Sequence, residues 1–320
     1  MTPFDLPSAP AFRVVRDLEP VPADLRGAVV AIGNFDGVHR GHRAVIDAAA
    51  ERARALGRPV AALTFEPHPR AVFAPHAPLF RLTPEPVKLA ALARAGCDAA
   101  FVMTFDAAFA GVSADDFVDQ VLVERLAISG AAVGFDFHFG SRRGGSPAFL
   151  VQAGARRGFA VDVVGPLHHE GRPVSSSAIR SLLASGRIAE ANDLLGYPWF
   201  IIGTVIRGDQ RGRTLGYPTA NIRLDPACGL AHGIYAVRAD VAGRRYDAVA
   251  SFGRRPTFDN GAPLLEVFLF DFSGDLYGAE LAVTFHARLR EERKFDSVAA
   301  LVTQMNADSA DARLALAGCA

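Results

Sequence analysis

Short apolar runs alternate with helical patterns from residue 28 to residue 165, and few folds are compatible with that order. The run "AVVAI" at 28–32 is followed by 42–56, where Val45 and Ala49 begin a series of apolar residues at helical spacing. Further apolar runs and helical segments then alternate in the same way. Repeated βαβ units explain this order, so the first half predicts a parallel sheet with flanking helices, an α/β Rossmann-like domain.

The pattern changes after about residue 198, where the apolar segments become closely spaced and are separated by glycine and proline. This predicts a small antiparallel barrel or sandwich, followed by a terminal helix. The expected strands are 199–206, 233–241, 244–252, 264–272 and 281–289, and the expected helix is 296–316. A chain of 320 residues is long enough for two domains, which we place at 1–185 and 186–320.

The charge balance argues against a nucleic-acid partner. The chain has 34 basic and 34 acidic residues, so it lacks the excess positive charge that binding to a polyanion requires. Its only lysines are Lys88 and Lys294, and neither follows a glycine. A P-loop with its Gly-Lys pair is therefore excluded. We expect small-molecule substrates, and any phosphate is expected to be held by arginine, backbone or metal.

Cysteine usage and apolar segments indicate the compartment. The three cysteines, Cys97, Cys228 and Cys319, are too far apart for a C-x-x-C metal site or a disulfide framework. No segment approaches the roughly 18 uncharged apolar residues of a membrane span, and the N-terminus has no leader profile. The sequence therefore predicts a cytoplasmic protein without a membrane partner, a monomer or a weak homo-oligomer.

The stretch "GNFDGVHRGH" at 33–42 directly follows the first expected strand. If a helix begins near Val38, His39 and His42 project on one side of its first turn. Two imidazoles at a helix N-terminus can donate hydrogen bonds to phosphoryl oxygens and stabilise the charge that grows in an in-line displacement at phosphorus. A plain turn with two solvated histidines is the alternative.

Two further stretches have both a binding and a structural interpretation. In "VSSSAIR" at 174–180, the hydroxyls and Arg180 suit a clamp on phosphates, but serines at a helix start also occur for capping alone. In "GFDFHFGSRRGG" at 134–145, strand-like alternation would place the phenylalanines on one face and Asp136 with His138 on the other. A core interpretation covers that pattern only partly, which favours a binding loop.

With "LTFEPHP" at 63–69, these stretches resemble the adenylyltransferase half of bacterial bifunctional riboflavin kinase/FAD synthetases over residues 27–195, within the wider H-x-G-H nucleotidyltransferases. The resemblance implies that His39 and His42 act on the α-phosphate of ATP and that Asp136 lies in the nucleotide or flavin pocket. Ser177 stands where the family commonly has threonine. The remaining ATP-binding residues implied by it are Gly33, Asn34, Phe35, Asp36, Gly41, Ser176, Ser177 and Arg180.

In the second half, "GTVIRGDQRGRTLGYPTANI" at 203–222 contains a glycine-rich loop that can wrap phosphates. Its candidate phosphate-contacting glycines are Gly208, Gly212 and Gly216. Thr219 and Asn221 are two apart in an extended segment and so point the same way, and their neutral oxygens suit Mg²⁺ that also keeps waters and ATP phosphates. A β-hairpin with a surface Thr-x-Asn is the alternative.

Glu266 lies in the apolar segment "LLEVFLF". Alternation puts it on one face with Phe268 and Phe270, where an unpartnered carboxylate costs free energy. This setting is typical of a general base. A solvent-facing edge strand is the alternative, but it would expose both phenylalanines.

Residues 186–320 resemble the riboflavin kinase module of the same family, a small β-barrel. The matching stretches are "GYPTAN" at 216–221, "GIYAV" at 233–237, "RRPTF" at 254–258, "LEVFLFDFSGDLYG" at 265–278 and "LREERKF" at 289–295. The resemblance implies that Thr219 and Asn221 bind Mg-ATP, that Glu266 takes the proton from the riboflavin 5′-hydroxyl, and that Arg290 belongs to the segment closing over the flavin. "ASFG" at 250–253 departs from the Ala-Asn-Ile-Gly of many members.

The two resemblances together imply flavin cofactor synthesis in two steps. Riboflavin and ATP give FMN and ADP at the C-terminal domain, and FMN and a second ATP give FAD and pyrophosphate at the N-terminal domain. The alternative is a monofunctional adenylyltransferase or kinase whose other module only binds flavin.

Overall fold

The structure is a computed structural model, and it describes residues 12–208, 216–254 and 263–318. The chain divides into two compact units. Among the described residues, the sheet unit contains 12–79 and Thr83–Ser175, and the barrel unit contains Phe80–Leu82 and 176–318. The domain boundary at 185/186 stays a prediction.

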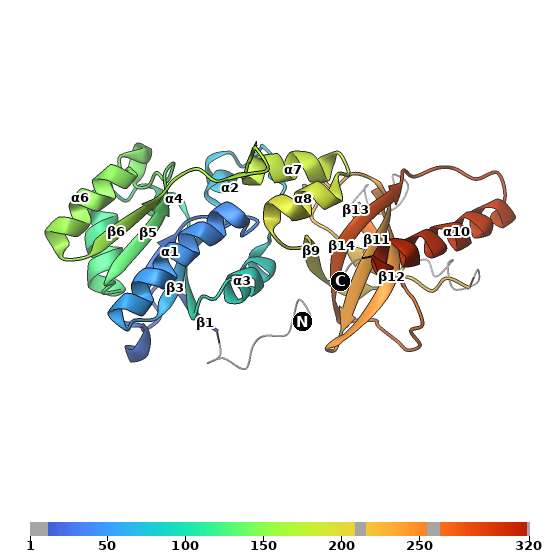
Figure 1. The fold of residues 1–320 in the computed structure, drawn as a ribbon, viewed down its shortest axis with the longest axis horizontal. Helices are drawn as coiled ribbons and strands as arrows, with labels where there is room; N and C mark the ends of the chain where they lie inside the picture. The colour runs from blue at the N-terminus through green and yellow to red at the C-terminus, as the bar shows by residue number, and fades with distance from the viewer. Residues whose placement is uncertain (1–11, 209–215, 255–262, 319–320) are drawn as a thin grey trace. The chain divides into compact units, whose positions relative to one another are not determined.

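The sheet unit is built on six parallel strands in the order β1-β4-β3-β2-β5-β6 (Figure 1). The strands are β1 (Arg13–Arg16), β2 (Val29–Ile32), β3 (Val60–Glu66), β4 (Ala99–Thr104), β5 (Gly130–Gly134) and β6 (Ala160–Val164). The apolar alternation of the first half thus gives the predicted parallel sheet. The edge strand β1 was not predicted, because an arginine stands at each end of its two valines and leaves no apolar run.

Helices cover both faces of this sheet. Helices α1 (Arg40–Leu56) and α3 (Glu85–Arg94) pack with one face, and the π-helical segment η2 (Phe117–Arg125) and helix α6 (Pro147–Arg157) pack with the other. Because consecutive residues of a strand point to opposite faces, each strand supplies apolar side chains to both layers. Helix α1 ends where predicted, at Gly57 in the left-handed conformation, although Leu56 is 49% exposed.

Short elements connect these layers. They are η1 (Ala23–Leu25), α2 (Pro69–Phe73), α4 (Ala107–Ala110), α5 (Ala114–Asp116), η3 (Ser141–Arg143), and the strands β7 (His168–His169) and β8 (Arg172–Pro173), which pair as a small hairpin.

The barrel unit contains a closed barrel in the order β10-β13-β12-β11-β14-β9, with antiparallel neighbours throughout (Figure 1). Its strands are β9 (Phe200–Ile206), β10 (Ala220–Arg223), β11 (Gly233–Val241), β12 (Arg244–Arg254), β13 (Pro263–Leu269) and β14 (Glu280–Arg290). All five predicted strands are present, and β10 closes the barrel. Fully buried side chains such as Tyr235, Phe252 and Phe285 form part of its core.

Three helices belong to the described part of the barrel unit: α7 (Ser176–Ala184), α8 (Ile188–Leu195) and the terminal helix α10 (Val298–Ala317). Helix α10 packs on the outside of the barrel, where Ala312 and Leu316 contact a cluster that includes Ala236 and Val249. The terminal helix was predicted at this place in the sequence.

Candidate active sites

The loop that follows β2 is held by a buried threonine. Asp36 is 2% exposed, and its Oδ1 accepts hydrogen bonds from the backbone N–H of Thr83 (2.9 Å) and its hydroxyl (3.3 Å). The N–H of Gly37 donates to the same hydroxyl at 2.8 Å. The φ angles of Phe35 (51°), Gly37 (95°) and Val38 (35°) are positive, which is costly for the two residues with side chains. Thr83 therefore fixes a strained loop.

His39 and His42 lie side by side at the start of α1. The helix begins at Arg40, two residues later than predicted, so His39 is its N-cap. The ring nitrogen Nδ1 of His39 accepts the backbone N–H of His42 at 3.2 Å. The two rings stack with centroids 3.7 Å apart at 13°, and Phe35 meets His42 edge-on at 5.3 Å. The predicted pairing of the imidazoles is thus present, with capping as its local cause.

Gly33 and Gly41 leave room for these rings. A Cβ atom on Gly41 would lie 3.2 Å from the His39 ring, and one on Gly33 would lie 3.4 Å from the Phe35 ring. A side chain at Gly41 would therefore crowd the imidazole stack.

Burial lowers the pKa of His42 well below 6.5, and the electrostatic interactions with His39 and Lys88 lower it further. The ring is therefore neutral near pH 7 and carries one N–H. Within the described part of the chain, nothing hydrogen-bonds to the buried Nδ1 of His42. A neutral imidazole of this kind can donate one hydrogen bond to a phosphoryl oxygen without releasing a proton.

Sequence reasoning missed Thr83 and Lys88. Lys88 is fully buried in α3, and its Nζ lies 2.6 Å from Oε1 of Glu66. Thr83 contacts a loop that lies 46 residues earlier, and no local pattern reveals such a contact. The one available signal was a lysine among the apolar positions of "VKLAAL".

The segment after β5 differs from the prediction. Strand β5 ends at Gly134, so strand alternation does not extend through the phenylalanines. Phe137 and Phe139 stack at 5.4 Å and pack with the core, whereas Phe135 is 52% exposed. The core interpretation therefore holds for two of the three rings. Asp136 is exposed in the turn, and its carbonyl oxygen lies 2.8 Å from Nδ1 of His138.

The serine cluster and Arg180 lie on α7, in the barrel unit. Ser177 is exposed and Ser176 is half-buried. Nε of Arg180 donates to the carbonyl oxygen of Phe80 at 2.6 Å. Convergence of these groups on the phosphates held at His39 and His42 stays a prediction.

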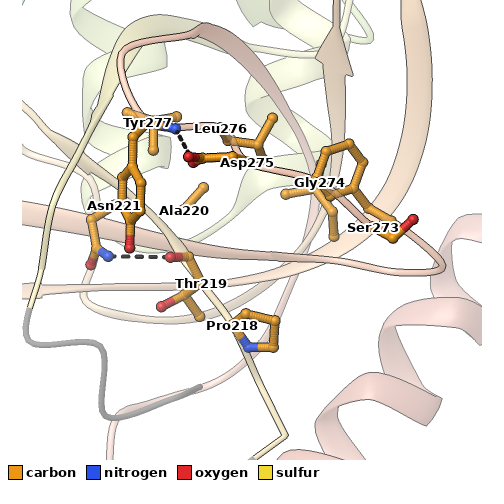
Figure 2. A pocket seen from close by; sticks show the side chains of 12 residues that line it. Pro218, Thr219, Ala220, Asn221, Ser273, Gly274, Asp275, Leu276 and Tyr277 are labelled. Atoms are coloured by element: carbon orange, nitrogen blue, oxygen red, sulfur yellow. Dashed lines mark hydrogen bonds between the residues drawn. The ribbon is translucent and has the colours of Figure 1, made fainter. Parts of the chain in front are cut away.

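The barrel unit has a cavity of about 550 Å³ beside β10 (Figure 2). It is lined by Val205, Pro218, Thr219, Ala220, Asn221, Leu269, Phe272, Ser273, Gly274, Asp275, Leu276 and Tyr277. Figure 2 shows the segment 273–277 facing the segment 218–221, which carries Thr219 and Asn221. The guanidinium of Arg207 lies over the Tyr277 ring at 5.1 Å. This cavity combines apolar walls with a few polar groups, which is typical of a small-molecule site.

Thr219 and Asn221 both line this cavity, as expected for two residues on one side of an extended segment. Nδ2 of Asn221 donates to the carbonyl oxygen of Thr219 at 3.3 Å. A Cβ on Gly208 would lie 2.7 Å from that Nδ2, so Gly208 permits close approach of the loop. Gly216 has a φ of 82°, and Gly212 lies outside the described residues.

Glu266 lies in the middle of three strands. In the barrel's register, it stands opposite Asn221 of β10 on one side and Ser251 of β12 on the other. The predicted alternation is present: Leu265 and Val267 are fully buried, and Glu266 is half-buried on the other face. Since directly opposed residues of paired strands have adjacent side chains, the side chains of Glu266 and Asn221 lie next to each other on one face.

Arg290 is held by the terminal helix. Its Nε and Nη2 lie 2.7 and 2.6 Å from the two carboxylate oxygens of Asp308, which is 4% exposed. Nη1 donates to the carbonyl oxygen of Glu291 at 2.8 Å. The guanidinium thus joins the end of β14 to α10, and its contact with flavin stays a prediction.

Comparison with known proteins covers both halves. Residues 21–178 match the family model for FAD synthetase, and residues 195–316 match the model for riboflavin kinase. The chain is 42% identical over 303 residues to the bifunctional riboflavin kinase/FMN adenylyltransferase of Pseudomonas fluorescens, covering 94% of this chain and 97% of the relative. The enzyme of the same name from Escherichia coli K12 is 39% identical, over 94% of this chain and 96% of the relative. The enzyme of that name from Bacillus subtilis is 38% identical, over 89% of this chain and 91% of the relative. The chain belongs to the bifunctional riboflavin kinase/FMN adenylyltransferase family.

Membership of this family explains the two different units. The parallel sheet is the FMN adenylyltransferase (FAD synthetase) half, and the barrel is the riboflavin kinase half. Riboflavin, FMN, FAD and ATP are its substrates and products. A crystal structure of a Streptococcus pneumoniae protein named as a macrolide-efflux protein also matches, with a TM-score of 0.83 and 32% identity, over 94% of this chain and 98% of that chain. Among the described residues, no helix meets the length and hydropathy needed to span a bilayer.

Proposed function

We propose that the sheet unit joins FMN to AMP at the His39–His42 pair. A phosphate oxygen of FMN attacks the α-phosphorus of ATP, the bond to the bridging oxygen breaks, and pyrophosphate leaves. The two imidazoles donate N–H groups to the α-phosphoryl oxygens and stabilise the charge of the transition state. The stacked rings and the neutral state of His42 support this role.

The proposed adenylyltransferase site includes further residues. The loop residues Gly33, Asn34, Phe35 and Asp36, with Gly41, hold the nucleotide, and the N-terminus of α1 favours its negative charge. We further propose that Ser176, Ser177 and Arg180 hold the outer phosphates and that Asp136 lines the nucleotide or flavin pocket. Hydroxyls and a guanidinium are suitable partners for phosphate oxygens.

In the barrel unit, we propose that Glu266 is the general base of the kinase. It accepts the proton of the riboflavin 5′-hydroxyl while that oxygen attacks the γ-phosphorus of ATP, and ADP leaves with the electron pair of the broken P–O bond. The register that places Glu266 opposite Asn221 supports this role, since it brings the base next to the proposed ATP cavity. Gly208, Gly212 and Gly216 are proposed to contact the ATP phosphates, and Arg290 the flavin.

The donors in the barrel cavity fit a magnesium ion. Thr219 and Asn221 offer neutral oxygens from one side of the cavity, the ligand type that Mg²⁺ accepts alongside waters and phosphates. When bound, the ion neutralises charge on the transferring phosphates. Gly208 leaves the Asn221 amide in place beside the loop.

The observation that carries the proposal is that each unit has its own polar site: an imidazole stack at the end of β2, and a carboxylate beside a cavity in the barrel. Kinetics of two single variants test it. Glu266→Gln should lower kcat for FMN formation by about a thousandfold. His42→Asn should lower kcat for FAD formation from FMN by about a hundredfold. Either variant retaining full activity in its own reaction would contradict the assigned role.

A further inference from the structure

A fully buried lysine lies beneath the proposed adenylyltransferase site. Lys88 belongs to the buried face of α3, where its neighbours Val87, Ala91 and Leu92 are apolar core residues. Lysine is rarely buried to this degree, because its charge must leave water. A buried ammonium group therefore needs hydrogen-bond acceptors or a carboxylate close to it.

Three oxygens at the end of β3 lie close to the ammonium group of Lys88. Its Nζ lies 2.6 Å from Oε1 of Glu66, 3.1 Å from Oγ1 of Thr64 and 3.3 Å from the carbonyl oxygen of Phe65. These oxygens are suitable acceptors for the N–H donors of an ammonium group. The charge is thus placed where strands of a parallel sheet end, the edge at which such folds bind ligands.

Two routes connect this charge to the histidine pair. Thr64 accepts from Lys88 and donates its hydroxyl hydrogen to the carbonyl oxygen of Asn34 at 3.3 Å, which anchors the loop before His39. The charge also acts through space on His42, where burial opposes protonation of the ring most and the interactions with His39 and Lys88 oppose it further. Lys88 therefore bears on the position and the protonation state of His42.

We propose that Lys88 is a positioning residue for nucleotidyl transfer, whose buried ammonium holds the 33–37 loop through Thr64 and Asn34 and so keeps the His39–His42 pair in place. The inference deepens the proposed function, because it rests on the role assigned to His42. The competing explanation is that Lys88 only neutralises the buried carboxylate of Glu66.

Three variants separate the two explanations. Lys88→Met keeps the length of the side chain and removes the charge. Lys88→Met combined with Glu66→Gln removes both charges, so neither is left buried alone, and this variant carries the test if the single variant does not fold. Arg52→Met is the matched control, since it breaks an ion pair with Asp162 in the same unit at the far end of α1.

Each variant is assayed for FAD formation from FMN and for FMN formation from riboflavin, and the pKa of His42 is measured by NMR on histidine-labelled protein. We expect Lys88→Met and the double variant to lower kcat for FAD formation by about tenfold, the usual cost of losing a group that orients a site residue. FMN formation is expected to stay unchanged in all variants. The pKa of His42 is expected to rise slightly in both lysine variants, because burial of the ring, the largest cause of the lowered pKa, remains, and to stay unchanged in Arg52→Met.

Recovery of wild-type FAD formation in the double variant, or an unchanged pKa of His42 in the lysine variants, would overturn the proposal. Either result would leave the proposed function intact, because the wild-type protein would still make FAD. If His42→Asn retained full FAD formation, the proposed function would fail instead. The NMR titration would then still show whether Lys88 controls the protonation of His42.

Discussion

At Gly41, a Cβ atom would lie 3.2 Å from the ring of His39. Substitution by alanine therefore tests whether FAD formation depends on the position of the imidazole stack. We predict that Gly41→Ala lowers FAD formation from FMN by about tenfold, because displacement of the stack misplaces donors aimed at the α-phosphate. Alanine favours a helix over glycine by about 1 kcal/mol, so the free energy of unfolding is not expected to fall.

Enzyme kinetics measure the loss of FAD formation, and urea unfolding measures the free energy of unfolding of the same variant. The control is Gly165→Ala in the same unit. A Cβ atom at Gly165 would have no neighbouring atom within 4 Å. Full adenylyltransferase activity in Gly41→Ala would mean that FAD formation does not depend on the position of the imidazole stack.

Gly208 is the corresponding position in the barrel, where a Cβ would lie 2.7 Å from Nδ2 of Asn221. We predict that Gly208→Ala lowers riboflavin kinase activity by about a hundredfold, because it displaces a proposed magnesium ligand. FAD formation from FMN should stay unchanged. Gly318→Ala, whose nearest contact is an ordinary 3.9 Å, is the control, and equal kinase activity in the two variants would count against the ligand role of Asn221.

Among the elements, β14 carries a histidine whose protonation opposes folding. Burial, with the charges of Arg238 and Arg245, lowers the pKa of His286 to about 4 from a usual 6.5. Between these two pH values the unfolded chain binds more protons than the folded one, so the free energy of unfolding falls as pH drops through this window. Because the ring is partly exposed, we expect a loss of about 1 to 2 kcal/mol.

The prediction can be read from the fluorescence of Trp199, the chain's single tryptophan, which is buried in the barrel unit. Urea unfolding at pH 7 and pH 5 should show a smaller pH effect in His286→Gln than in the wild type. The same pH effect in both proteins would assign the dependence to other groups.

Helix α10 is fastened to β14 by the buried pair of Arg290 and Asp308. Removal of one partner leaves a buried charge uncompensated, so Asp308→Ala should lower the free energy of unfolding of the barrel unit by about 3 kcal/mol. Asp271→Ala removes the exposed partner of Arg313 on the same helix and should cost less than about 1 kcal/mol. Equal losses in the two variants would mean that the buried pair does not fasten the helix.

Elements were predictable where periodicity and local turn chemistry agree. Helix α1 follows its apolar spacing and ends at Gly57, and the alternation around Glu266 is that of a barrel strand. The segment after β5 broke the prediction, because a turn begins at Gly134 while the phenylalanine spacing still resembles a strand. Alternating residues predict a strand only as far as the backbone stays extended.

For the whole molecule, the sequence predicted the two domain types, and it led to a proposed set of site residues in each. It did not predict the groups that support those sites. Thr83 and Lys88 reach the histidine loop through tertiary contacts, and Asp308 reaches Arg290 in the same way. Such contacts depend on which elements become neighbours, which spacing within one segment does not encode.

The central claim is that one chain contains two chemically independent sites that act in sequence. Mixing two variants, each altered at one site, tests it most directly, with riboflavin, ATP and MgCl₂ supplied and the flavins separated afterwards. We predict that His42→Ala stops at FMN, that Glu266→Ala leaves riboflavin unchanged but converts added FMN to FAD, and that the mixture makes FAD from riboflavin. Loss of both activities in either folded variant, or no FAD from the mixture, would contradict the claim.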